Sequence, residues 1–202
     1  MTDPERALTD LARRLPTAGP PAGTLSAIAE RAEREGLLDV AYSQIDSPLG
    51  PLTAAATKRG LVTLSYPEHT VDEVLGRIAR DVSPRILEAP ARLDPLRREL
   101  EEYFEGGRTR FDTRVDWRLT AGFFRAVLRA TAKIRYGQVR SYAEVAASAG
   151  SPRAVRAAGN GLGSNPMPIV VPCHRVVASG GKLGGYTGGI ERKEFLLDLE
   201  RR

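Results

Sequence analysis

The stretch Pro168-Ile169-Val170-Val171-Pro172-Cys173-His174-Arg175-Val176-Val177 contains the only cysteine of the 202-residue chain. A short apolar run between two prolines precedes the thiol, and an imidazole and a guanidinium follow it directly. A nucleophilic cysteine reacts as the thiolate, and a neighbouring base or cation makes that form easier to reach. His174 is one of only two histidines, the other being His69. The stretch therefore indicates a reactive Cys173 with His174 as its base, and the alternative is a buried, unreactive thiol.

The residues before this stretch have the pattern of three helices. Apolar residues at helical spacing predict a helix over 123–134, and Ser141 with Glu144 forms a capping-box pattern that starts a second helix. This second helix is expected to stop near residue 150. Ser151 is expected to cap the third helix, over 152–162, with a proline at its first position. Two short helices joined by a glycine-containing turn make a helix-turn-helix, which is typical of DNA-binding domains.

With its flanks, the cysteine stretch resembles the O6-alkylguanine-DNA alkyltransferases, also called methylated-DNA–protein-cysteine methyltransferases. Their hallmark Pro-Cys-His-Arg-Val is found at 172–176. Other segments that resemble the family in order and spacing are Gly137 to Tyr142, Pro152 to Gly159, Asn165-Pro166, Gly184 to Gly189 and Lys193 to Glu200. The close resemblance covers residues 123–200, and several segments that agree in order are far more specific than one motif.

The resemblance implies a role for each residue of the reacting group. Cys173 is the acceptor, whose thiolate attacks the alkyl carbon while guanine leaves. His174 is the base, and it acts through a bridging water because adjacent side chains rarely face each other. Glu200 orients the imidazole and stabilises its charge. Tyr142 helps to rotate the nucleotide out of the duplex and donates a hydrogen bond to N3 of the leaving base.

The resemblance also implies how DNA is held. The small residues of helix 152–162 would let it enter the minor groove, while Arg156 would fill the gap left by the extruded base. The residues implied in DNA binding are Arg156, Ala154, Ala157, Gly159, Arg153 and Ser179. The residues implied in the hinge and the base pocket are Asn165, Val176, Tyr186, Thr187 and Pro168. The Val176 carbonyl is expected to accept a hydrogen bond from the base.

The N-terminal half predicts a small α/β domain. Strands are expected at 40–45, 52–57, 61–66 and 111–117, and helices at 71–81 and 94–104. The resemblance implies a ribonuclease-H-like scaffold over residues 37–117. It implies a mainly α, winged-helix-like domain, with the helix-turn-helix and the catalytic residues, over 118–202. Residues 1–36 are expected to form a partly mobile extension, with helices at 1–15 and 24–36 joined by a proline- and glycine-rich linker.

The charge of the chain is unevenly distributed. Residues 118–202 contain 14 Lys and Arg against 5 Asp and Glu, a net charge of +9, whereas the other 117 residues have 16 and 20, a net charge of −4. Positive charge gathered in one half is typical of a protein that binds a polyanion such as DNA. A solvated arginine-rich surface is the alternative, and charge alone does not decide between them.

The composition excludes several classes of site. One cysteine excludes an internal disulfide and favours a reducing compartment, and one cysteine with two separated histidines cannot form a zinc site. No apolar run reaches the roughly 18 residues of a membrane span, and the N-terminus shows no signal-peptide pattern. We expect a cytoplasmic protein that associates with the nucleoid when on DNA, without cofactor or metal.

The expected function is DNA repair by direct reversal. The chain would transfer an alkyl group from O6-alkylguanine, and from O4-alkylthymine, in double-stranded DNA to its own Cys173. A thioether is stable and no second cysteine could resolve it, so we expect a single turnover by a monomer, with cooperative binding along DNA left open. The alternatives are a non-catalytic lesion-binding protein, a sequence-specific regulator using the helix-turn-helix, and a cysteine hydrolase using His69.

Overall fold

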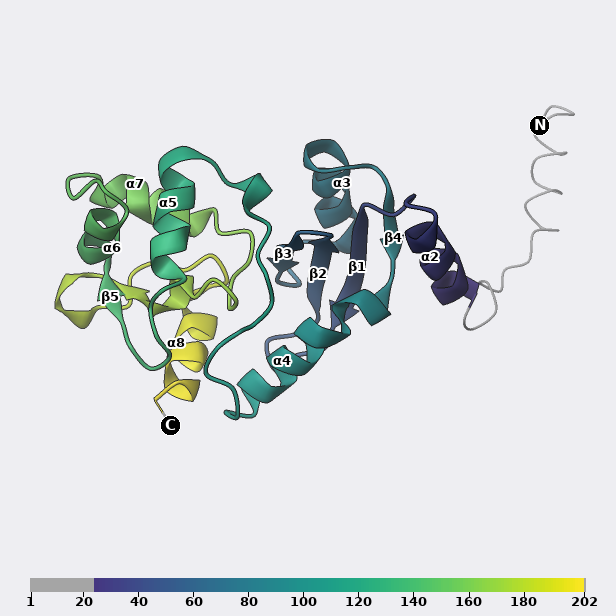
Figure 1. The fold of residues 1–202 in the computed structure, drawn as a ribbon. Helices are drawn as coiled ribbons and strands as arrows, with labels where there is room; N and C mark the ends of the chain where they lie inside the picture. Colours follow the sequence, from purple (N-terminus) through teal and green to yellow (C-terminus); the bar gives the residue numbers. More distant parts are fainter. Residues whose placement is uncertain (1–23, 202) are drawn as a thin grey trace, which may run out of the picture.

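The computed structural model describes residues 24–201. A sheet with its covering helices occupies one side of the molecule and a group of helices the other, as Figure 1 shows. The helix expected at 1–15 and the linker after it lie outside the described residues. Within residues 24–201, no helix is both long enough and apolar enough to cross a membrane.

The sheet forms where the sequence predicts strands at 40–45, 52–57 and 61–66. In the part of the chain that the structure describes, its strands are β1 (Val40–Ile45), β2 (Leu52–Thr57), β3 (Gly60–Ser65) and β4 (Ile86–Glu88), in the order β3-β2-β1-β4. The first three strands are antiparallel neighbours, whereas β4 runs parallel to β1. The short β4 was not expected from the sequence. Strand β3 thus lies at the edge of the sheet that faces the C-terminal helices (Figure 1).

Helices cover both faces of this sheet. Helix α3 (Val71–Asp81) packs Val74 and Ile78 against one face, and its N-terminus has a capping box between Thr70 and Glu73. Helix α4 (Asp94–Phe104) follows the 3-10 turn η1 (Pro90–Leu93) and packs on the other face. Both helices have the bounds that the sequence predicts.

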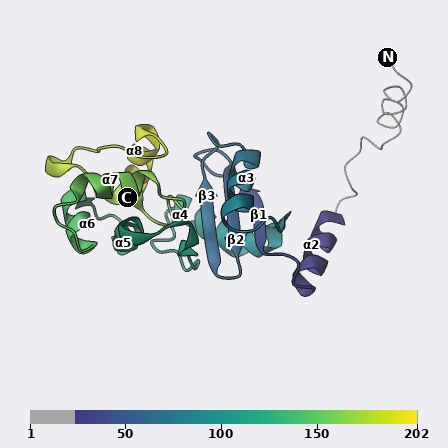
Figure 2. The same ribbon diagram turned by 90° about the horizontal axis from the view of Figure 1, so that it is seen from above.

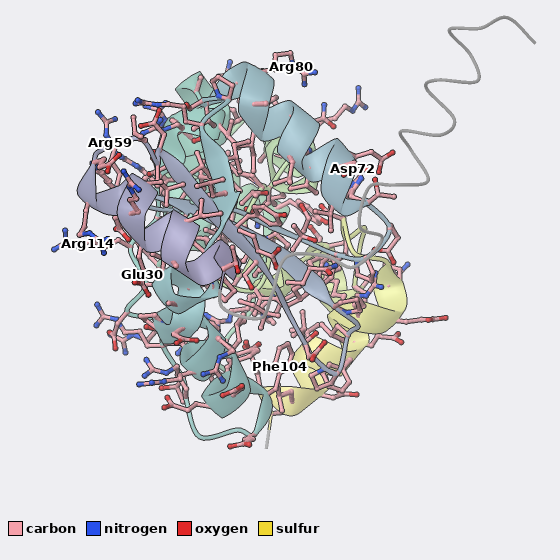
Figure 3. The ribbon with its side chains drawn as sticks, turned by 90° about the vertical axis from the view of Figure 1, so that its right-hand side faces the viewer. Glu30, Arg59, Asp72, Arg80, Phe104 and Arg114 are labelled. Atoms are coloured by element: carbon pink, nitrogen blue, oxygen red, sulfur yellow. The ribbon has the colours of Figure 1, made fainter. Side chains whose placement is uncertain are left out.

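Helix α2 (Thr24–Arg34) lies beside β4 (Figure 1). In both ribbon views it is at the end of the molecule away from the C-terminal helices (Figures 1 and 2). It forms where the sequence predicts a helix. Its Ala29 is buried in a small apolar cluster with Leu38, Ala41 and Ala89. Charged side chains such as Glu30, Asp72 and Arg80 project from this end of the molecule into solvent (Figure 3).

The prediction of a strand at 111–117 is wrong. Only Val115 forms an isolated bridge, to Leu61, and 117–119 is the 3-10 turn η2 (Trp117–Leu119). The backbone N–H groups of residues 112 and 113 donate to the buried Glu99 carboxylate at 3.1 and 3.2 Å instead of to a neighbouring strand. Since a side chain of α4 satisfies these donors, the segment runs beside β3 without continuing the ladder.

The C-terminal helices are α5 (Gly122–Thr131), α6 (Tyr142–Ser148), α7 (Val155–Gly163) and α8 (Ile190–Leu199). The capping box of Ser141 and Glu144 is confirmed at the start of α6. The expected start of the third helix is wrong. Ala154 has φ −90° and ψ 37°, outside the helical region, and its N–H closes a turn onto the Ser151 carbonyl at 2.9 Å. That turn replaces the first helical turn, so α7 begins three residues after the proline.

Two tiny strands bring distant parts of this half together. Strand β5 (Arg140–Ser141) pairs in parallel with β6 (Val176–Val177), which follows the 3-10 turn η3 (Cys173–Arg175). The pairing places the start of α6 beside the cysteine stretch. The N-terminal residue of α6 therefore lies near Cys173 although the two are far apart in sequence.

One apolar cluster joins the two sides of the molecule. Leu96, Leu100 and Tyr103 of α4 belong to the same buried cluster as Val171 and Leu196. The edge strand β3 is also bonded to the turn before the cysteine: the Leu64 N–H and the Thr63 hydroxyl donate to the Pro166 carbonyl at 2.8 and 3.0 Å. The sheet thus directly supports the cysteine stretch.

Candidate active site

Cys173 is buried at the start of η3, with 4% of its surface exposed. The run before it is tightly folded, and Ile169 has φ 73°, a left-handed conformation that is rare for a β-branched residue. Asn165 holds this run in place. Its Nδ2 donates to the Val171 carbonyl at 2.8 Å and to the Cys173 Sγ at 3.0 Å, while its Oδ1 accepts from the Met167 N–H at 3.1 Å. The resemblance implied this hinge, and the Asn165 N–H also donates to the Leu162 carbonyl of α7.

Burial raises the pKa of the Cys173 thiol to about 11, because an ionised sulfur loses its hydration in an apolar site. The hydrogen bond from Asn165 and the positive charge of Lys193 act in the opposite direction without cancelling the effect of burial. The resting protein therefore holds a protonated thiol at neutral pH. Attack on an alkyl carbon requires a base that removes this proton during the reaction.

His174 is fully buried and its Nε2 lies 2.9 Å from Glu200 Oε1. Burial lowers the pKa of the imidazole, so the ring is neutral at pH 7. An ionised carboxylate only accepts hydrogen bonds, so Nε2 carries the proton and Nδ1 has the free lone pair. Nδ1 is buried and has no hydrogen-bond partner among the described residues. The ring is therefore in the tautomer that can accept a proton at Nδ1.

Glu200 accepts hydrogen bonds from several buried donors besides His174. Arg175 forms an ion pair with it, with Nε and Nη2 each 2.9 Å from a carboxylate oxygen, and Arg175 Nη1 donates to the Ile134 carbonyl at 2.5 Å. Burial alone would raise the pKa of Glu200, but the hydrogen bonds from His174 and Arg175 outweigh it and lower the pKa to about 2. The carboxylate is therefore ionised throughout the physiological range.

Tyr103 of α4 donates its hydroxyl to Glu200 Oε1 at 2.7 Å. Burial raises the pKa of this phenol, so the hydroxyl stays protonated and remains a donor. Sequence reasoning missed Tyr103, because it reads as an apolar residue on the buried face of its helix. The sheet half of the chain thus contributes a hydrogen bond to the group around Cys173.

A cavity of about 230 Å³ opens beside the thiol. It is lined by Tyr142, Gly159, Leu162, Gly163, Cys173, Gly185, Tyr186 and Thr187. Of the residues expected in the base pocket, Tyr186 and Thr187 line it, whereas Asn165 and Pro168 line an adjoining cavity of about 250 Å³. His69 lines that second cavity and not the one at the thiol.

Tyr142 forms one wall of the cavity at the thiol. Its hydroxyl donates to the Gly185 carbonyl at 3.1 Å, and burial raises the pKa of the phenol. Gly184 has φ +67°, and a Cβ there would lie 2.9 Å from the Tyr142 hydroxyl oxygen, so this contact requires glycine. The glycine-rich loop that the sequence singles out is therefore shaped around this tyrosine.

Lys193 is fully buried and was not expected to take part in the site. Its Nζ donates to the Val176 carbonyl at 2.6 Å, to the Leu183 carbonyl, and to the Gly185 carbonyl at 3.3 Å. Burial lowers the pKa of this ammonium to about 8. The Val176 carbonyl, expected to accept from a bound base, thus already accepts from Lys193 and has one remaining lone pair. In sequence Lys193 resembles any charged helical residue, although it shares a helix face with Leu196 and Leu197.

Apart from Ser179, the residues expected to bind DNA lie in α7 and in the turn before it. Arg156 is exposed in the helix, and Arg153 is exposed in the turn before it, not in the helix as expected. Ala154 at the N-cap is half-buried, as are Ala157 and Gly159 within the helix, and Ser179 is exposed in the 3-10 turn η4 (Ser179–Gly181). Small residues thus accompany two exposed guanidinium groups, as the sequence predicts.

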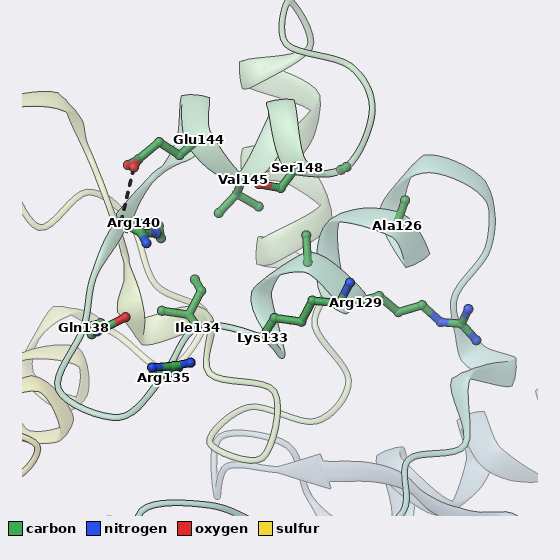
Figure 4. A pocket seen from close by; sticks show the side chains of 12 residues that line it. Ala126, Arg129, Lys133, Ile134, Arg135, Gln138, Arg140, Glu144, Val145 and Ser148 are labelled. Carbon is green, nitrogen blue, oxygen red and sulfur yellow. Dashed lines mark ion pairs between the residues drawn. The ribbon is translucent and has the colours of Figure 1, made fainter.

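A larger groove of about 560 Å³ lies between α5 and α6, shown in Figure 4. Lys133, Arg135 and Arg140 contribute positive charge to it, whereas the Arg129 guanidinium lies over the Trp117 ring (Figure 4). The groove contains none of the predicted site residues. Within residues 24–201, no three His, Cys, Asp or Glu side chains gather where they could hold a metal ion.

Comparisons with known proteins agree with this geometry. The model of the 6-O-methylguanine DNA methyltransferase ribonuclease-like domain matches residues 40–117, and that of the DNA-binding domain of the same family matches 122–202. The methylated-DNA–protein-cysteine methyltransferase of Mycolicibacterium paratuberculosis is 42% identical over 163 residues, 81% of this chain and 93% of that protein.

Solved structures give the same result. A crystal structure of Mycobacterium tuberculosis O6-methylguanine methyltransferase is similar with a TM-score of 0.68 and 40% identity, covering 80% of this chain and 93% of that one. A structure of Mycobacterium tuberculosis OGT in complex with DNA has the same TM-score and identity and covers 80% and 92%. The chain therefore belongs to the 6-O-methylguanine DNA methyltransferase family, with a ribonuclease-like N-terminal part and a DNA-binding C-terminal part.

Proposed function

We propose that this protein repairs double-stranded DNA by transferring the alkyl group of O6-alkylguanine, and of O4-alkylthymine, to its own Cys173. The observation that carries the proposal is the thiol in the wall of a cavity, next to a neutral His174 that is paired with an ionised Glu200. A pair of this kind can remove the thiol proton at neutral pH without placing a net charge on the resting site.

The proton balance of the transfer follows from the site. The thiol proton passes through a water molecule to His174 Nδ1, and the Cys173 sulfur forms a bond to the alkyl carbon as the bond from that carbon to O6 breaks. The imidazolium formed is stabilised by Glu200. The negative charge developing on the base is met by the Tyr142 hydroxyl, which must then leave the Gly185 carbonyl that it contacts in this structure. The base anion then takes up a proton from water, and the imidazolium releases the thiol proton to solvent. The product is a thioether, so each molecule reacts once.

DNA binding is proposed for the C-terminal part, residues 118–202, with residues 37–117 as its scaffold and 1–36 as an extension. The net charge of +9 in the C-terminal part and the exposed Arg153 and Arg156 support contacts with phosphates. The small residues of α7 support docking in the minor groove, with Arg156 replacing a base that is flipped into the cavity. We propose that the protein acts as a monomer in the cytoplasm, where a reducing environment keeps Cys173 as a thiol.

The alternatives are less well supported. A lesion-binding protein without transfer would not need the His174–Glu200 pair at a buried thiol. A regulator that reads base edges would need long polar side chains where α7 has alanine and glycine. A hydrolase using His69 is disfavoured because that imidazole lines the adjoining cavity and not that of Cys173.

The test is the intact mass of the protein after mixing with a duplex that contains one O6-methylguanine. We expect a gain of one CH2 per molecule that saturates at one, and no gain for Cys173→Ser. Sustained turnover, or a gain that persists in Cys173→Ser, would contradict the proposal. In the same assay at low DNA concentration, Arg156→Ala should react more slowly, while Arg59→Ala, an exposed arginine after β2, serves as the matched charge control.

A further inference from the structure

Tyr66, a tyrosine of the sheet half, contacts a residue that lines the cavity at Cys173. Tyr66 follows β3 directly, and only 4% of its surface is exposed. Its hydroxyl oxygen lies 2.7 Å from that of Tyr186, and the two rings meet edge to face with centroids 6.3 Å apart. Tyr66 is buried and Tyr186 is half-buried, and each hydroxyl is the other's hydrogen-bond partner. Loss of one hydroxyl would therefore leave the second without this hydrogen bond.

Tyr186 lies between this contact and the reacting group. It lines the cavity at Cys173, and its ring meets the His174 ring edge to face at 6.4 Å and 89°. The orientation of one ring thus determines both the wall facing a bound base and the packing against the imidazole. Tyr66 holds the Tyr186 ring at its hydroxyl.

Tyr66 is itself firmly held. The guanidinium carbon of Arg192 lies 4.7 Å from the centre of its ring, and Arg192 is paired with Glu68 at 2.6 Å. Arg192 Nη1 also donates to the Gly188 carbonyl at 2.9 Å, and a Cβ at Gly188 would lie 2.5 Å from the Tyr66 ring. Tyr66, Glu68, Tyr186, Gly188 and Arg192 together form what we call the Tyr66 latch. The latch ties the end of β3 to the loop before α8.

We propose that Tyr66 is a positioning residue for alkyl transfer, which acts by holding Tyr186 as the rigid wall of the base pocket. The inference rests on the proposed function, because it assumes that the flipped base enters the cavity that Tyr186 lines. It assigns to the N-terminal half an indirect part in the rate of the chemical step. Since Tyr66 does not line that cavity, it acts only through Tyr186.

The test is a double-mutant cycle on single-turnover methyl transfer from an O6-methylguanine duplex, with rate constant and DNA affinity measured separately. Tyr66→Phe removes one oxygen and keeps the ring. We expect about a tenfold lower rate constant at saturating DNA, because the productive orientation of Tyr186 then leaves a partly buried hydroxyl unpaired and becomes a minor conformer, with the affinity for DNA unchanged. Tyr186→Phe should lower the rate constant equally. In the Tyr186→Phe background, Tyr66→Phe should lower it by less than about a further twofold. Tyr42→Phe, in the same sheet, is the matched control and should react as wild type.

Two results would overturn the inference. One is a wild-type rate for Tyr66→Phe, and the other is an equal loss of rate for Tyr66→Phe with and without Tyr186→Phe. Tyr186→Ala separates this inference from the proposed function, because it removes the ring and not just the hydroxyl. A wild-type rate for Tyr186→Ala would contradict the base-pocket assignment. A slow Tyr186→Ala beside a wild-type Tyr66→Phe would contradict the latch alone.

Discussion

Replacing Glu200 by glutamine should destabilise the protein strongly, because every group around this carboxylate is a donor. Tyr103, His174, Arg175 and the Gly137 N–H all donate to its oxygens. A glutamine amide presents two N–H groups where an acceptor is needed, and it leaves the guanidinium of Arg175 buried without a counter-charge. Loss of one member of a buried ion pair costs about 3–5 kcal/mol.

The pKa of Glu200 gives a second value for the free energy that its ionised carboxylate contributes to folding. A fall in its pKa from 4.5 to about 2 on folding corresponds to about 3 kcal/mol, since each tenfold change in the ionisation equilibrium is worth about 1.4 kcal/mol. The pKa is lowered because the folded protein favours the ionised carboxylate, so ionisation of Glu200 stabilises the native state. Its contribution is complete above pH 4.5 and is lost as the pH falls from 4.5 through 2. At neutral pH the whole of it should disappear in Glu200→Gln.

The assay is unfolding in urea and by heat at pH 7. We expect the free energy of unfolding to fall by about 3–5 kcal/mol, and the melting temperature by about 6–20 °C. Glu194→Gln, an exposed glutamate of the same helix, is the control and should change the free energy by less than about 0.5 kcal/mol. Adding Arg175→Met to Glu200→Gln should restore part of the stability, because the unpaired charge is then removed.

The reasoning would be refuted by a Glu200→Gln protein within about 1 kcal/mol of wild type. It would be refuted equally by a double variant less stable than Glu200→Gln alone. Either result would mean that the pair with Arg175 contributes little to the native state. The depressed pKa would then have another origin.

Further predictions concern the reaction and the packing. The rate of methyl transfer should be flat between pH 7 and 8, because His174 is already neutral there, and should fall only below the ordinary imidazole pKa of 6.5. A tenfold rise in the rate per pH unit would instead indicate attack by a freely ionised Cys173. Gly188→Ala should slow transfer, since its Cβ would press on Tyr66, and a wild-type rate would show that the loop yields. Gly76→Ala, in α3 with open space around it, should raise the free energy of unfolding in urea by about 0.5–1 kcal/mol, and an unchanged or lower value would contradict this.

Local sequence signals determined most of the elements. Helices α3 and α4 begin and end where the apolar spacing predicts, and the capping box at Ser141 starts α6. Two errors arose where backbone groups find partners that no local pattern reveals. At 112–113 the partner is the distant Glu99 carboxylate, and before α7 it is a backbone turn at Ser151.

The residues of the site also divide into those that the sequence predicts and those that it does not reveal. The resemblance to the family placed Cys173, His174 and Glu200 in one group, and the structure brings the imidazole and the carboxylate into contact. Tyr66, Tyr103 and Lys193 were missed, because their polar atoms act only after tertiary packing brings them to partners far away in sequence. A tyrosine on an apolar helix face does not reveal that its hydroxyl reaches a carboxylate nearly a hundred positions later.

The apolar cluster that runs from α4 to α8 has a consequence for cooperativity. Neither half can open without exposing side chains that the other half covers, so the described chain should melt in a single calorimetric transition whose van't Hoff and calorimetric enthalpies agree. Expressed alone, residues 118–202 would lose the part of this apolar cluster that Leu96, Leu100 and Tyr103 of α4 contribute. Such a fragment should be prone to aggregation even though it contains every reacting atom.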